Sequence, residues 1–131
     1  MVYTEQSSIE PPKEDYVALL TNQVIRRSGL NPTYGAATAG GDTFTGSNRT
    51  FLHVKVGSTA TTITLPVPTG KGVDFVDIAI GTLTVGPVTS AERMIGPCMA
   101  EVFSDPVTGL VTVNYSQVTG VTVAVFDLYP A

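Results

Sequence analysis

The chain has 131 residues, of which 43% are hydrophobic and only 14% are charged. A chain of this length forms one hydrophobic core without disulfides or metals, and its single cysteine cannot form an intrachain disulfide. The net charge of -4 argues against a nucleic-acid partner, because neutralising phosphates requires clustered Lys and Arg.

No segment has the pattern of a secretory leader or of a membrane span. The first residues, MVYTEQSSIEPPKED, lack the basic start and the apolar stretch of a signal peptide. No apolar stretch approaches the ~20 residues that a transmembrane helix needs. We therefore expect a protein that is made in a cytoplasm, keeps its cysteine reduced and has no membrane partner.

Residues 1–20 differ in composition from the rest, and we predict that they form an extended N-terminal arm. Acidic residues dominate here, and Pro11-Pro12 favours an extended path and prevents a helix across it. The apolar cluster at 16–20 is suited to anchoring this arm, while a frayed terminus is the alternative interpretation. The residues of this arm expected to contact a partner protein or another subunit are Val2, Tyr3, Ile9, Pro11, Pro12, Tyr16, Leu19 and Leu20.

Residues 21–131 predict a single β-domain. Short runs rich in Val, Ile and Thr are separated by Gly, Pro, Ser and Asn, which is the pattern of many short strands joined by turns. Residues 28–48 predict a long Gly-rich loop, in which Phe44 docks its ring. The expected strands are 21–27, 49–56, 60–65, 73–80, 82–85, 91–95, 99–103, 110–115 and 121–128.

Alternation within these strands predicts their faces. In the strand at 49–56, Leu52 and Val54 fall on one face and His53 on the other. This strand and the one at 60–65 predict a hairpin with a turn at Gly57-Ser58.

The strands at 110–115 and 121–128 form the clearest pair, joined by residues 117–120. About eight short strands in one chain of this size predict an all-β fold. The domain is expected to be a β-sandwich or jelly-roll-like domain with an extended N-terminal arm.

Few residues are of a kind that carries chemistry. His53 is the only histidine, and a catalytic triad needs a nucleophile and an orienting acid that spacing does not reveal. One His and one Cys do not make a dedicated zinc site, and the Gly-rich AATAGGDT lacks the Lys of a phosphate-binding loop. We therefore predict no enzyme activity, no cofactor, no metal and no small-molecule substrate.

The most distinctive local string is ERMIGP at 92–97. Glu92 and Arg93 open a short strand and point to opposite faces, so each can pair with a neighbouring strand or subunit. Two interpretations stay open, a strand that ends a sheet and an ion pair between subunits.

Three strings, kept in the same order, resemble small head proteins of tailed bacteriophages. They are RTFLHVKVGSTATTITLPVP, SAERMIGP and VTVNYSQVTGVTVAVFDL, and the resemblance covers about residues 24–128. The sequence departs from that group at Cys98, where the group has an apolar aromatic residue, and in its longer acidic arm. The proteins it resembles are capsid decoration, or cement, proteins.

This resemblance implies a virion structural protein on the outer surface of the phage head. It implies the major capsid protein as partner, a homotrimer at local three-fold positions, and bridging of capsid subunits against internal DNA pressure. Two alternatives stay open. One is a head-tail connector or tail-tube protein of the virion. The other is a carbohydrate or host-surface binding module, against which the absence of tryptophan argues.

Overall fold

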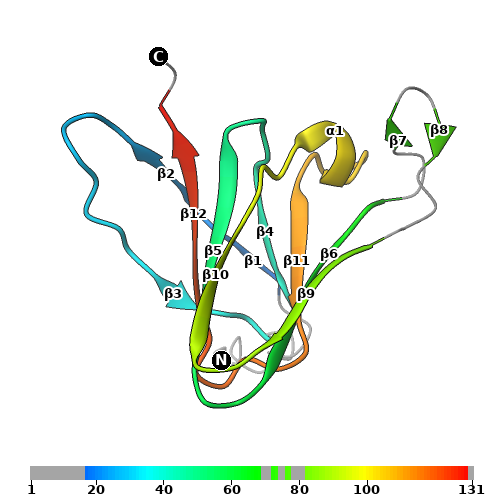
Figure 1. Ribbon diagram of the computed structural model, residues 1–131. Coiled ribbons are helices and arrows are strands. Elements are labelled where there is room, and N and C mark those ends of the chain that lie inside the picture. The colour runs from blue at the N-terminus through cyan, green and yellow to red at the C-terminus, as the bar shows by residue number, and fades with distance from the viewer. Residues whose placement is uncertain (1–16, 69–71, 74–75, 78–81, 130–131) are drawn as a thin grey trace, which may run out of the picture.

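The computed structural model describes residues 17–68, 72–73, 76–77 and 82–129 (Figure 1). Its regular structure is almost entirely β, in two sheets that enclose one core. The first sheet has the order β1 (Ala18–Leu19), β4 (Asp42–Phe44), β11 (Val111–Tyr115), β6 (Thr61–Pro66) and β9 (Thr82–Val88). The second has the order β10 (Ala91–Ile95), β5 (Thr50–Val56), β12 (Thr122–Leu128) and β2 (Asn22–Ile25), and β3 (Gly35–Ala36) also pairs with β12.

Three further elements complete the described part of the chain. β7 (Gly72–Val73) and β8 (Val76–Asp77) form a two-stranded ribbon, and α1 (Ala100–Phe103) is a single helical turn. Their place beside the sheets is visible in Figure 1. The predicted all-β, sandwich-like fold is confirmed.

The core consists of side chains at alternate positions of the strands. Leu52 and Val54 of β5 are fully buried in it, as the alternation predicted. Burying a side chain of this size contributes about 1.5–3 kcal/mol to stability. The same cluster includes Phe44, Ile63, Leu65, Val111, Val113, Val123 and Val125.

Neighbouring strands of the chain cross between the sheets. The predicted hairpin of 49–56 and 60–65 is wrong, because β5 pairs with β10 and β12 whereas β6 pairs with β9 and β11. The strands at 110–115 and 121–128 also lie in different sheets. The physical reason is that a strand with period-2 alternation turns its apolar face to the core whether it stays in the sheet of the preceding strand or crosses to the other sheet. Alternation therefore does not determine whether the next strand stays in its sheet or crosses.

Three local predictions also differ from the structure. Residues 28–48 are not a loop throughout, because they contain β3 and β4, and Phe44 is fully buried as a β4 residue. Residues 99–103 contain α1 instead of a strand, and Val102 is the buried residue of that turn. Within 73–80, the described residues belong to β7 and β8 instead of one strand.

The last residues of the predicted arm include a short strand, β1. β1 pairs in parallel with β4, with Ala18 opposite Asp42 and Leu19 opposite Thr43. Residues 17–20 therefore belong to the first sheet and its border, while residues 1–16 lie outside the described residues.

A buried aspartate connects β4 with β11. Asp42 is completely buried, and the Tyr115 hydroxyl donates to its Oδ2 at 2.7 Å. The Thr38 backbone N–H donates to the same oxygen at 3.3 Å. Burial, the hydrogen bond to Asp42 and the charge of Asp42 all raise the pKa of Tyr115 above its ordinary value. The phenol is therefore held as a donor to the carboxylate.

We predict that Tyr115→Phe destabilises the protein by about 1–3 kcal/mol, because it removes a donor from a buried charged acceptor. Equilibrium urea unfolding measures the change. Tyr129→Phe is the matched control, since Tyr129 is half-exposed and loses only its hydroxyl. Equal effects of the two substitutions would contradict the proposed role of the Tyr115 hydroxyl.

Candidate functional site

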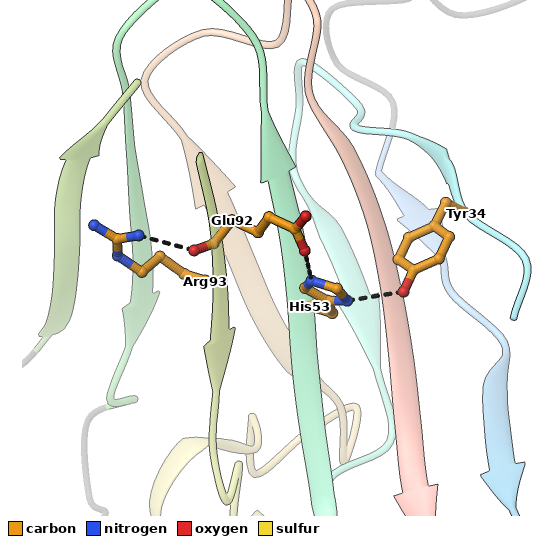
Figure 2. Close-up of polar contacts among 4 residues, drawn as sticks. All are labelled: Tyr34, His53, Glu92 and Arg93. Carbon is orange, nitrogen blue, oxygen red and sulfur yellow. Dashed lines mark hydrogen bonds and ion pairs between the residues drawn. The ribbon is translucent and has the colours of Figure 1, made fainter. Parts of the chain in front are cut away.

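Strand β10, which ends the second sheet in the described part of the chain, contains the first four residues of the ERMIGP string. It pairs antiparallel with β5, which places Met94 opposite His53 and Arg93 opposite Val54. Successive side chains alternate, so Glu92 and Met94 lie over the outer face of this sheet. Arg93 leaves the strand in the other direction (Figure 2), toward a cleft beside β9. The predicted opposite orientation of Glu92 and Arg93 is confirmed.

A chain of polar contacts crosses the outer face. Tyr34 Oη lies 2.8 Å from His53 Nδ1, and His53 Nε2 lies 2.6 Å from Glu92 Oε1 (Figure 2). One arrangement of protons satisfies all three groups, in which the Tyr34 hydroxyl donates to Nδ1 and the Nε2–H donates to Glu92. The contacts join the segment before β3, the centre of β5 and the edge strand β10.

The order hydroxyl, imidazole, carboxylate is also the order of a nucleophilic catalytic site. In such a site the carboxylate is buried and orients the histidine. Here the exposure is reversed, because the side chain of His53 is 11% exposed and that of Glu92 is 58% exposed. We therefore interpret these polar contacts as structural. They hold the segment of Tyr34 and the edge strand β10 against the sheet.

An apolar pocket of about 280 Å³ lies beside this polar chain. The rings of Phe51 and Phe126 pack at 5.5 Å between centroids, and Tyr34 meets Phe126 edge-on at 6.0 Å. Met94 stands at the pocket with 63% of its surface exposed. Both ring nitrogens of His53 are already engaged, so the pocket offers mainly carbon surface. The lining is completed by Ile25, Leu30 and Pro32.

The residues predicted for contact are spread over the molecule. Leu19 is 66% exposed on β1, which ends the first sheet on the side farthest from β9. Leu20 packs partly against the core. The polar partner of Glu92, His53, lies within the same chain, so this contact of Glu92 is intrachain. Arg93 donates to the backbone oxygen of Glu92 at 2.8 Å. Six predicted residues lie outside the described part of the chain: Val2, Tyr3, Ile9, Pro11, Pro12 and Tyr16.

Sequence reasoning missed the aromatic surroundings of His53. Tyr34 lies within residues 28–48, which the sequence predicted as a loop, and Phe126 is an outward residue of β12 opposite Phe51. The available signal was the apolar residue Phe51 on the same face as His53, because outward positions of a sheet that faces water are usually polar.

Among the described residues, no helix is long and apolar enough to span a membrane, and no group of three potential metal ligands occurs. No family model matches the chain, and no curated protein or solved structure matches it. The site is therefore interpreted from its own geometry.

We predict that His53→Ala costs more stability than Glu92→Ala. His53 is buried and its loss removes contacts with Tyr34, Glu92 and Phe126, so a cost of about 1–3 kcal/mol is expected. Glu92 is mostly exposed, and its pair with His53 is expected to contribute below about 1 kcal/mol. Urea unfolding of both variants checks the order, and a larger loss for Glu92→Ala would refute it.

Proposed function

We propose that this protein is a capsid decoration protein of a tailed bacteriophage. It binds the outer surface of the head, contacts the major capsid protein and bridges neighbouring capsid subunits. The proposal combines the sequence resemblance over residues 24–128 with one structural observation, the exposed Met94 beside an aromatic pocket at a free sheet edge. That surface has the chemistry of a protein contact.

The surface around Met94 resembles the energetic centre of a protein interface. Such centres contain aromatic and Met side chains in a well-packed pocket, surrounded by a polar rim that excludes water. Here Tyr34, Phe51 and Phe126 supply the rings. Glu92, and Lys55 with its ammonium 3.9 Å from the centre of the Tyr34 ring, supply charged groups at the border. An apolar side chain of the capsid protein fits this arrangement.

The physics of a shell favours such a contact. A decoration protein is bound in many copies, and linked contacts gain effective concentration, so each individual contact can remain modest. The low proportion of charged residues, 14% of the chain, reduces the desolvation cost of packing side by side. A contact surface that is already folded also loses less conformational entropy on docking than a segment that must first become ordered.

Copy number in purified virions tests the proposal directly. Quantitative mass spectrometry against the major capsid protein is expected to give hundreds of copies, near a simple ratio to the capsid subunit. A few dozen copies or fewer would overturn the decoration role in favour of a connector or tail component. Absence from virions would overturn a structural role and favour a host-surface binding module.

A substitution at the proposed contact gives a second test. Met94→Asp is expected to weaken binding to purified heads by more than tenfold, because it puts a charge on the apolar centre. Val107→Asp is the matched control, since Val107 is 92% exposed and lies in a turn away from the pocket. Sedimentation of heads with bound protein measures both, and equal binding by the two variants would exclude the Met94 surface as the contact.

A further inference from the structure

The sandwich is open along one side, between β9 and β10. Within the described residues, β9 pairs with β6 alone and β10 pairs with β5 alone, so each ends its sheet. The two strands follow one another in the chain and diverge from their connection at 89–90 (Figure 1). Two free edges, one from each sheet, therefore lie on the same side of the core. Free edges present backbone N–H and C=O groups with which another strand can form hydrogen bonds.

A cleft of about 280 Å³ lies between these edges. Leu83 at its border is 37% exposed, so apolar surface continues from the cleft to its rim. Cys98 is 1% exposed, and burial raises the pKa of its thiol to about 11. The thiol therefore adds no charge to its wall of the cleft. Other lining residues include Val85, Arg93, Ile95, Gly96, Pro97 and Phe103.

Arg93 gives the cleft a charge preference. Its guanidinium donates to the Glu92 carbonyl oxygen, and it forms no ion pair with a carboxylate among the described residues. An extended segment that carries apolar side chains and at least one carboxylate matches this cleft. Its backbone can form hydrogen bonds with the edge strands, its apolar side chains can pack on the apolar wall, and its carboxylate can pair with Arg93.

The chain contains one segment of that chemistry outside the described residues. Residues 1–16 combine Val2, Tyr3 and Ile9 with an excess of acidic residues over the single lysine. Sixteen extended residues reach about 50 Å. They precede β1, which lies at the opposite edge of the first sheet from β9, with β4, β11 and β6 between them. The segment therefore starts on the side of the domain that faces away from its own cleft.

We propose that residues 1–16 of one copy bind as an extended strand in the β9–β10 cleft of a second copy. The contact is heterologous, because the arm of one protomer meets a different surface of the next. Repeating this contact gives a closed ring when the rotation from each copy to the next brings the last copy back to the first. This inference needs no capsid and does not rest on the proposed function.

The first experiment measures the mass of the full chain and of charge variants by sedimentation velocity, without phage heads. The full chain is expected to form an oligomer of defined size, and Arg93→Glu is expected to raise its dissociation constant at least tenfold. Combining Arg93→Glu with Glu5→Lys and Glu10→Lys is expected to restore much of that loss. Arg27→Glu is the matched control, because Arg27 is an exposed arginine next to β2 and away from the cleft. A monomeric full chain, or equal losses for the two single arginine variants, would overturn the proposal.

The second experiment identifies which copy supplies the arm. The full chain with Val2→Cys and Leu83→Cys is oxidised under native conditions, where the buried Cys98 is shielded from reaction. The expected product is a disulfide-linked multimer on a non-reducing gel. A disulfide within monomers would show that the arm binds its own cleft, and no disulfide would show that residue 2 does not lie beside residue 83 in any copy. Either result would overturn arm exchange while leaving the virion copy-number test unaffected.

Discussion

The alternation of β5 is the constraint on which most of this molecule depends. β5 lies between β10 and β12, and it directs Leu52 and Val54 into the core while it directs Phe51 and His53 outward. One strand therefore supplies both the centre of the hydrophobic core and the floor of the aromatic pocket. A shift of the register by one residue would exchange these two sets, so the burial of Leu52 and Val54 also fixes the position of His53.

Polar contacts of one buried and one partly buried carboxylate add specificity to a core that is otherwise apolar. Asp42 joins β4 to β11 through the Tyr115 hydroxyl. Asp127 of β12 accepts a hydrogen bond from Thr50 at 2.5 Å and one from Asn22 at 3.2 Å, which connects β12 with β5 and β2. Aliphatic side chains pack against many alternatives, whereas a buried carboxylate needs its own donors. These contacts therefore favour the observed strand order over other arrangements of similar strands.

The strands that end the two sheets in the described residues, β9 and β10, are protected from pairing with unrelated chains and still expose apolar surface to a partner. Natural proteins protect edge strands with charges, proline and short length, because an unprotected edge pairs with other chains. β10 has only five residues and carries Glu92 and Arg93, and β9 contains Gly86-Pro87. The same two strands also carry Leu83 and Met94, both exposed. This combination disfavours indiscriminate pairing and leaves apolar surface for a partner whose charge matches Arg93.

The sequence by itself determined the fold class, most strand positions and the buried face of the clearest strands. Alternation was sufficient where apolar residues with a period of two have only one face to bury, as at Ile63 and Leu65 of β6. It did not reveal β4, because three residues are too few to define a period. Only the tertiary structure decided which sheet each strand enters and that His53 meets Tyr34 and Glu92, which are 19 and 39 residues away in the chain. Both depend on how the two sheets stack and on strand neighbours distant in sequence, and local patterning carries no information about either.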